Sequence, residues 1–294
     1  MLNVYIINQH RVIIKEKNAE MLTEWVIFCI IDPISPIGCM MILKERASMK
    51  AIIFNSGLGH RMGDETKTHH KSTTLLKNGE TIFHRQLRLL IAEGVTEFII
   101  TTGPFAEQLQ AEAADFPQAK FTFVPNDIYM KTNYIYSMYL AREYMDDDML
   151  FLHGDLVFNR KLAHDLIHCA DKDCATVNFK KALPEKDFKG RVQDGKVVEV
   201  SIKIFDEDCF AFQPFYKLQR AAASAWIGKV VEFIHKGEDR CYAENALNEI
   251  FPALNVRAFD YNGYYVDEID NVEDWARVKE EILPFDEADA KIFA

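Results

Sequence analysis

Between residues 49 and 152, short apolar runs alternate with stretches in which apolar residues recur at helical spacing. The apolar runs predict buried strands at Ala51–Phe54, Phe98–Ile100, Phe121–Val124 and Met149–Leu152. The stretches between them predict helices at Ile82–Ala92, near Ala106–Ala114 and at Tyr134–Tyr144. Because strands and helices alternate over about 100 residues, the pattern predicts a parallel, doubly wound sheet with helices on both faces.

The pattern changes past residue 170. The pair Asp194-Gly195 favours a hairpin turn. It is flanked by two strand-like stretches, Lys189–Val192 and Lys196–Ile202. Beyond them we expect helices near Tyr216–His235 and Glu244–Ile250, a strand near Val256–Tyr261 and a last helix at Val272–Ile282. The whole pattern predicts an α/β fold: a single doubly wound, Rossmann-like domain with a mostly parallel central sheet and a small antiparallel subregion on the substrate side.

Residues 1–48 stand apart from this domain. They contain a strand-like stretch at Val4–Ile7, an apolar run at Trp25–Ile31 and a proline-containing turn at Asp32–Gly38. Two interpretations stay open: an N-terminal extension that packs on the domain or on a second chain, and an upstream translated segment. We favour the second, with Met49 as the natural start, because a buried strand begins there without any need for what precedes it. The domain itself is then 49–294.

Charge and cysteine usage narrow the class of protein. The chain has 34 Lys+Arg against 45 Asp+Glu, a net charge of −11, and the balance argues against a nucleic-acid partner. Its longest apolar run, Trp25–Ile31, is far shorter than the roughly 20 residues of a membrane span and lacks the flanks of a signal peptide. The six cysteines are Cys29, Cys39, Cys169, Cys174, Cys209 and Cys241. Their spacing is not that of a zinc site, and we expect them to be reduced thiols in the cytoplasm.

The loop after the first strand carries features of a phosphate site. Gly57 and Gly59 let backbone amides approach an anion, and the guanidinium of Arg61 suits phosphate. Lys71 offers a second cation. The pattern is neither a dinucleotide fingerprint nor a P-loop. A Gly-x-Gly alone is often an ordinary tight turn, but together with these two cations it favours phosphate binding.

Two aspartates are candidate Mg²⁺ ligands. Asp155 follows the fourth predicted strand, where a carboxylate binds a metal or else caps a helix or turn. Near the C-terminus, Asp270 or Asn271 could simply cap the last helix. If the preceding strand brings this segment to the ligand edge of the sheet, the two aspartates could share one metal.

In chain order, these positions resemble a known family. The resemblance is carried by Lys50–Ile53, Gly57–Arg61, Lys71, Asp155 and Glu268–Asp274. It is a resemblance to the nucleotidyltransferases, which couple an NTP to a phosphorylated small molecule, and it covers roughly 49–282. Within that family, His70-Lys71-Ser72 and Asn133–Ala141 are most similar to the bacterial CTP:phosphocholine cytidylyltransferases.

The resemblance implies a role for each position. It implies that the nucleotide is held by Ser56, Gly57, Leu58 and Gly59, with Asn133 and Ser137 beside the nucleotide or the acceptor. It makes Lys71 and Arg61 the catalytic cations, and Asp155 and Asp270 the Mg²⁺ ligands. The chain departs from the broader family where His70 replaces a proline, a change that the choline branch tolerates, and where Asn55-Ser56-Gly57 replaces Ala-Ala-Gly or Ala-Gly-Gly.

The acceptor side is predicted around Tyr242 and Glu244. A cation such as choline favours an aromatic face and a nearby carboxylate, and Glu244 stands about where the resemblance implies an acceptor-side acid. Phe188, Phe210 and Phe212 are further candidates, although each is more typical of a core. The similar choline enzymes carry a tryptophan in the stretch that matches 180–200, and this chain has none there. That absence favours phosphoethanolamine, aminoethyl-phosphonate or another phosphorylated amine over phosphocholine.

The acceptor phosphate is already ionised, so the reaction needs no general base: one of its oxygens would attack the α-phosphorus of CTP in line and expel pyrophosphate. We therefore expect a cytoplasmic, Mg²⁺-dependent cytidylyltransferase that binds CTP and a phosphorylated small-molecule acceptor. A sugar-1-phosphate nucleotidyltransferase using another NTP and a non-catalytic nucleotide-binding regulatory module stay open as alternatives. A dinucleotide-dependent oxidoreductase is disfavoured because the third glycine is missing.

Overall fold

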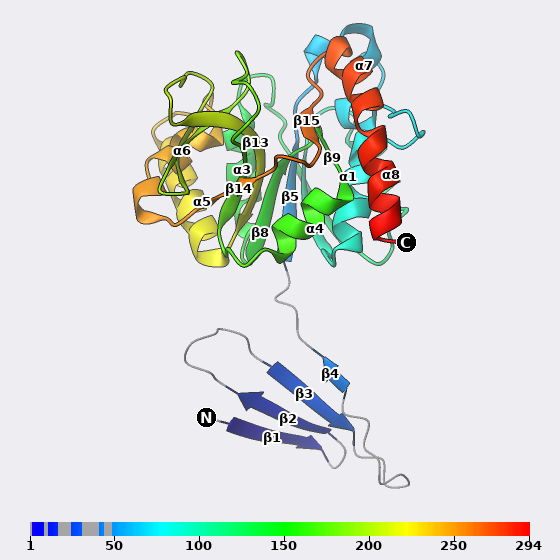
Figure 1. Cartoon of the computed structure of the whole chain (residues 1–294), viewed down its shortest axis with the longest axis vertical. Coiled ribbons are helices and arrows are strands. Elements are labelled where there is room, and N and C mark those ends of the chain that lie inside the picture. The colour runs from blue at the N-terminus through cyan, green and yellow to red at the C-terminus, as the bar shows by residue number, and fades with distance from the viewer. Residues whose placement is uncertain (1, 9–10, 17–24, 31–40, 44–48) are drawn as a thin grey trace. The chain divides into compact units, whose positions relative to one another are not determined.

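The computed structural model describes residues 2–8, 11–16, 25–30, 41–43 and 49–294. The chain divides into two compact units, Met1–Ser48 and Met49–Ala294. The described residues of the first unit form an antiparallel sheet of the order β1-β2-β3-β4 (Figure 1). Its strands are β1 Leu2–Asn8, β2 Arg11–Glu16, β3 Trp25–Ile30 and β4 Met41–Leu43. The expected turn at Asp32–Gly38 lies outside the described residues.

The second unit is built on a nine-stranded mixed sheet of the order β10-β14-β12-β11-β13-β8-β5-β6-β7. At one end lie four parallel neighbours, which are β7 Lys120–Pro125, β6 Glu97–Thr102, β5 Met49–Asn55 and β8 Asp148–His153. The other strands are β13 Cys209–Leu218, β11 Lys189–Gln193, β12 Lys196–Ser201, β14 Arg257–Asp260 and β10 Cys174–Asn178. All of their pairings, including that of β13 with β8, are antiparallel except β10 with β14.

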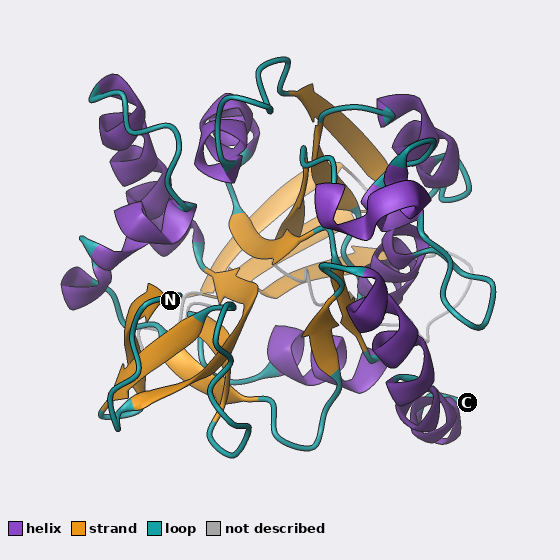
Figure 2. Cartoon of the chain, turned by 90° about the horizontal axis from the view of Figure 1, so that it is seen from above, coloured by secondary structure: helices purple, strands orange, loops and turns teal. Residues whose placement is uncertain are grey.

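Helices cover both faces of this sheet (Figure 1, Figure 2). They are α1 Ile82–Ala92, α2 Ala106–Ala113, α3 Tyr134–Ala141, α4 Arg160–His168, α5 Arg220–His235, α6 Ala243–Asn248, α7 Val272–Glu281 and α8 Leu283–Ile292. Short 3-10 helices are η1 His60–Thr66, η2 Lys71–Thr73, η3 Arg142–Tyr144 and η4 Phe251–Ala253. Each helix in the described part of the chain is too short or too polar to cross a bilayer.

The alternation of side chains along β5 explains the two layers. Ile52 points into a core formed with α3, α5 and α6, whereas Ile53 points into a second core formed with α1, α2 and α4. Both side chains are fully buried. A strand with two buried faces is a continuous apolar run, which is why its sequence carries no polar alternation.

The α/β class, the first four strands of the domain, the first three helices and the Asp194-Gly195 hairpin are confirmed. The sheet is more mixed than the expected mostly parallel one, because the hairpin strands pair antiparallel within the main sheet. The expected helix from Tyr216 begins only at Arg220, since Tyr216 and Leu218 pair with β8. The chain also continues beyond Ile282 into α8, and β10 and α4 were not anticipated.

A further pair of strands was also not anticipated from the sequence. β9 Leu156–Phe158 and β15 Val266–Glu268 form a separate two-stranded antiparallel sheet. This pairing brings the segment just before α7 beside the end of β8, although about 110 residues separate the two strands along the chain.

Candidate active site

The loop after β5 places a cation beside a close turn. Gly59 has φ +65°, a conformation that favours glycine, and a Cβ at this position would lie 2.8 Å from the Lys71 side chain. Gly57 is exposed, and a Cβ there would meet no neighbouring atom within 4 Å. Leu58 is partly exposed between them. The loop therefore needs Gly59 for the passage of Lys71, while Gly57 leaves open space at the surface.

His70 fixes the segment that carries Lys71. Its Nδ1 accepts a hydrogen bond from the backbone N–H of Ser72 (3.1 Å), and its Nε2 lies 2.8 Å from the carbonyl oxygen of Asn55, to which it donates. Only the neutral ring makes both bonds, because an N–H can only donate and a carbonyl can only accept. Burial accordingly lowers the pKa of His70 to about 4. The residue that departs from the family pattern thus holds η2 against the end of β5.

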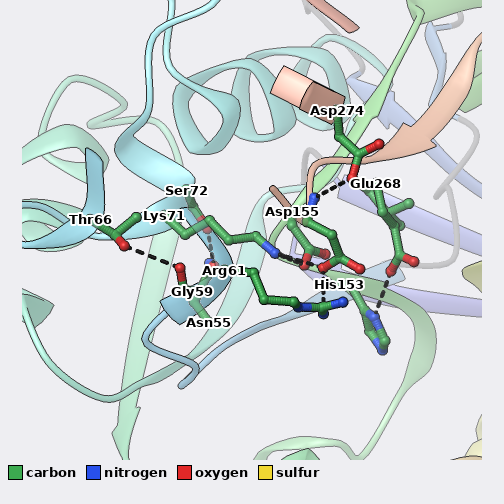
Figure 3. A network of polar contacts seen from close by, with 12 residues as sticks. Asn55, Gly59, Arg61, Thr66, Lys71, Ser72, His153, Asp155, Glu268 and Asp274 are labelled. Carbon is green, nitrogen blue, oxygen red and sulfur yellow. Dashed lines mark hydrogen bonds and ion pairs between the residues drawn. The ribbon is translucent and has the colours of Figure 1, made fainter. Parts of the chain in front are cut away.

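The predicted cations and carboxylates meet at one place (Figure 3). Lys71 Nζ lies 2.5 Å from Asp155 Oδ2 and 3.2 Å from Asp270 Oδ1. Arg61 Nη2 lies 2.8 Å from the same Asp270 oxygen. Burial alone would lower the pKa of Lys71, but the charges of Asp155 and Asp270 outweigh it, so the pKa is raised and the ammonium stays protonated.

The β9–β15 pairing supplies the second carboxylate. Ile269 donates its backbone N–H to the carbonyl oxygen of Asp155 (3.1 Å), which holds the C-terminal segment against the end of β8. Asn271 is the N-cap of α7 and accepts from the backbone N–H of Asp274 (2.8 Å). The capping role therefore belongs to Asn271, and the Asp270 carboxylate is left to face Lys71 and Arg61.

Two further ionisable groups complete the site, and sequence reasoning did not select either. Ligand atoms of His153, Asp155 and Glu268 lie within 4.8 Å of one another, with His153 Nδ1 3.0 Å from Glu268 Oε1. Burial alone would lower the pKa of His153, but the hydrogen bond and charge of Glu268 raise it to about 9. The signal was the two-residue spacing that places Asp155 just after His153, the last residue of β8, and Asp270 just after Glu268, the last residue of β15.

The arrangement fits a divalent cation. Asp155 Oδ1 is buried and has no hydrogen-bond partner among the described residues, and a buried carboxylate oxygen is costly unless something compensates it. The oxygen donors of Asp155, Asp270 and Glu268 are the type that Mg²⁺ prefers. These three residues could therefore hold such an ion.

The predicted nucleotide-side hydroxyls also come together. Ser56 Oγ lies 2.7 Å from Ser137 Oγ, and it donates to Thr101 Oγ1 (2.9 Å). Ser137 therefore donates its hydroxyl proton to Ser56, and it accepts a hydrogen bond from the side-chain amide of Asn126 (3.0 Å). Asn133 is the N-cap of α3, one turn before Ser137, and its side chain accepts from the N–H of Tyr134. The two serines join β5 to α3, and Asn133 begins that helix.

The predicted acceptor side is an aromatic wall with a carboxylate behind it. The Tyr242 ring lies 5.0 Å from the Phe188 ring and 6.3 Å from the Tyr134 ring, measured between centroids. Glu244 is 1% exposed, and it accepts hydrogen bonds from the hydroxyls of Tyr134 and of Tyr216, the latter at 2.9 Å. Both oxygens of Glu244 thus already accept hydrogen bonds, so this carboxylate holds the tyrosines of the aromatic wall in place.

A cavity of about 240 Å³ opens beside this wall, with Phe188 and Tyr242 in its lining. Phe212 is buried in the core, and Phe210 packs against Phe179 with a centroid distance of 4.7 Å. The two phenylalanines are not among the residues that line the cavity. Trp226 is buried in the core on the α5 side.

Comparisons with known proteins find relatives among the nucleotidyltransferases. The profile of a family described as MobA-like NTP transferase domain matches residues 51–195. The choline-phosphate cytidylyltransferase of Streptococcus pneumoniae is 26% identical over 244 residues, 79% of this chain and 97% of that protein. The CMP-5'-(3-aminopropyl)phosphonate synthase of Streptomyces rubellomurinus is 32% identical over 115 residues, which are 39% of this chain and 18% of that protein.

Solved structures share the fold. The CTP:phosphocholine cytidylyltransferase of Streptococcus pneumoniae superposes with a TM-score of 0.67 at 21% identity, over 80% of this chain and 99% of that one. The inositol-1-phosphate CTP transferase of T. maritima superposes with a TM-score of 0.65 at 16% identity, over 80% of this chain and 98% of that one. Residues 51–195 thus match the family described as MobA-like NTP transferase domain, and the chain is similar to bacterial choline-phosphate cytidylyltransferases.

Proposed function

We propose that the chain transfers a cytidylyl group from CTP to a phosphorylated small amine, giving a CDP-linked product and pyrophosphate. The observation that carries the proposal is the position of Lys71, 2.5 Å from Asp155 and 3.2 Å from Asp270 at the end of the parallel strands. Ligands bind outside the carboxyl ends of strands in open α/β sheets. The similarity to cytidylyltransferases supports CTP as the nucleotide.

In this proposal the four parallel strands form the part of the domain that binds the nucleotide, in a Rossmann-like arrangement. The loop Ser56–Gly59 would offer backbone amides to the triphosphate, and Arg61 would leave Asp270 to pair with a phosphate oxygen. Lys71 would neutralise charge that develops at the α-phosphate. The acceptor phosphate needs no base, so positioning and charge neutralisation account for the chemistry.

A divalent cation would be held by Asp155 and Asp270, with Glu268 beside them. When bound, Mg²⁺ supplies positive charge that stabilises the developing negative charge on the phosphates. The unpartnered Oδ1 of Asp155 supports this assignment, since Lys71 occupies only Oδ2. An acidic protein handling polyphosphates requires such local positive charge, because its net charge of −11 repels the substrate at long range.

The aromatic wall suits an amine on the acceptor. A quaternary or primary ammonium is attracted to aromatic faces, and Tyr242, Phe188 and Tyr134 provide them beside the Glu244 carboxylate. His153 connects this wall to the carboxylates, because its ring lies 4.8 Å from the Tyr134 ring and 3.0 Å from Glu268. The acceptor's amine and phosphate would therefore face two adjoining parts of one site.

A pyrophosphate-release screen tests the proposal. Purified protein and Mg²⁺ are combined with each of four NTPs and with phosphocholine, phosphoethanolamine, aminoethyl-phosphonate or sugar-1-phosphates. We expect release with CTP and a phosphorylated amine. Release with UTP or dTTP and a sugar phosphate would replace the proposal with a sugar-1-phosphate nucleotidyltransferase. CTP binding without release in any combination would indicate a regulatory module. The cytoplasmic location stays a prediction.

A further inference from the structure

A buried lysine on β13 lies outside the proposed catalytic site. Lys217, near the end of β13, is 4% exposed. Its ammonium donates to the carbonyl oxygens of Ile167 (3.5 Å) and Cys169 (3.1 Å), at the C-terminal end of α4. These two bonds cap the helix, where a positive charge is favourable. The third contact of Nζ is with the sulfur of Cys169, at 3.0 Å.

A second thiol faces the same sulfur. Cys169 Sγ and Cys174 Sγ are 3.6 Å apart. Cys169 directly follows α4 and is partly exposed, whereas Cys174 begins β10 and is fully buried. Cys174 therefore fills the core, whereas Cys169 does not. The geometry joins an accessible sulfur, a cation and a partner thiol.

The groups around Cys169 have opposite effects on the pKa of its thiol. Burial favours the protonated thiol, and so do the carbonyl oxygens of Leu166 (3.2 Å) and Asp171 (3.5 Å) and the charge of Asp171. The hydrogen bond from Cys174 and the bond and charge of Lys217 favour the thiolate, and together they lower the pKa of Cys169. The hydrogen bond with Cys169 and, after it, burial raise the pKa of Cys174, which therefore stays a thiol. Such a division suits one attacking and one resolving cysteine.

We propose that Cys169 is a site of oxidative modification that peroxide converts to a disulfide with Cys174. The Cys169 thiolate attacks one oxygen of hydrogen peroxide, forming a sulfenic acid and releasing hydroxide. The Cys174 thiol then attacks the oxidised sulfur, the S–S bond forms and water leaves. Peroxide takes up both electrons. The proposal stands on the Lys217, Cys169 and Cys174 contacts and is independent of the proposed transferase function.

The test follows the thiols by mass spectrometry in the full chain with Cys29→Ser and Cys39→Ser, which leaves Cys169, Cys174, Cys209 and Cys241. Hydrogen peroxide is expected to yield a linked Cys169–Cys174 peptide with loss of two hydrogen atoms. Cys209 and Cys241 are internal controls, because burial raises the pKa of both thiols. We expect them to remain reduced and open to alkylation after unfolding.

Two variants separate the steps. Cys174→Ser should stop at the sulfenic acid, which dimedone traps at Cys169. Lys217→Met should slow oxidation of Cys169 about tenfold by removing the cation. Iodoacetamide labelling of unmodified Cys169 from pH 5 to 9 provides a measurement that does not depend on this variant folding. Labelling of Cys169 with the same midpoint as Cys241, or peroxide treatment without a Cys169–Cys174 link, would overturn the proposal.

Discussion

The two sides of the candidate site are built differently. On the charged side, Arg61 and Lys71 pair with Asp155 and Asp270 across elements far apart in the chain, and one Asp155 oxygen has no partner among the described residues. On the aromatic side, both oxygens of Glu244 accept from tyrosine hydroxyls. Ion pairs can be exchanged for a ligand's charges, whereas a satisfied buried carboxylate holds its neighbours in place. Substitutions on the two sides should therefore have different consequences.

The largest effect is expected on the charged side. Asp155→Asn should lower kcat by about a thousandfold, because it removes a proposed metal ligand and the charge facing Lys71. Steady-state pyrophosphate release measures the change. Asp146→Asn is the matched control, since Asp146 is an exposed carboxylate paired with Lys50 (2.6 Å), and it should leave kcat unchanged. A kcat within tenfold of wild type for Asp155→Asn would remove this residue from the chemistry.

On the aromatic side, Glu244→Ala should act first on stability. The substitution leaves the buried hydroxyls of Tyr134 and Tyr216 without their acceptor, at a cost of about 3 kcal/mol in the free energy of unfolding. Urea denaturation measures this loss. Glu249→Ala, which alters an exposed carboxylate just after the same helix, should cost less than about 0.5 kcal/mol. Equal stability of the two variants would refute the structural role of Glu244.

The stability of the folded chain should depend on pH through His70, the residue just before Lys71. The pKa of His70 is about 4 in the folded chain and about 6.5 when unfolded, so the unfolded state binds the extra proton between these values. His70 therefore contributes about 3 kcal/mol to the free energy of unfolding above about pH 6.5, and this contribution is lost as the pH falls to about 4. Denaturation at several pH values measures it. His70→Gln should flatten this dependence relative to His235→Gln, an exposed control; parallel curves would contradict the assignment.

The smallest effect concerns acceptor affinity. Tyr242→Leu removes one aromatic face and should raise the KM for the acceptor about fivefold, the equivalent of about 1 kcal/mol, with kcat unchanged. The KM for CTP should not move. Tyr144→Leu replaces an exposed tyrosine of η3 and serves as the control. A change in the KM for CTP instead would place Tyr242 on the nucleotide side.

The charged side was the more predictable from sequence. Gly59, Lys71 and Asp155 follow predicted strands, and the carboxyl ends of parallel strands meet at one edge, so local patterns were enough to bring them together. Asp270 depended on the β9–β15 pairing between segments about 110 residues apart, which no local pattern encodes. The resemblance in chain order pointed to Asp270 where periodicity could not.

The aromatic side could be predicted only in part. Glu244 and Tyr242 were selected, but the partners of Glu244 come from α3 and β13, and Tyr216 was expected in a helix. Because those contacts are set by packing between distant elements, the sequence did not reveal that the carboxylate was already satisfied. The neutral state of His70 likewise depends on its contact with the end of β5.

The central claim is that Lys71, Asp155 and Asp270 act together on CTP in the presence of Mg²⁺. Phosphorus NMR of the purified chain with CTP, Mg²⁺ and a phosphorylated amine tests it most directly, because substrate, product and pyrophosphate are all observed. We predict that pyrophosphate and a CDP-linked product appear in equal amounts with the wild-type chain and that neither appears on the same timescale with Asp155→Asn. Equal product formation by the two proteins, or no pyrophosphate from the wild type with any acceptor of the panel, would contradict the account.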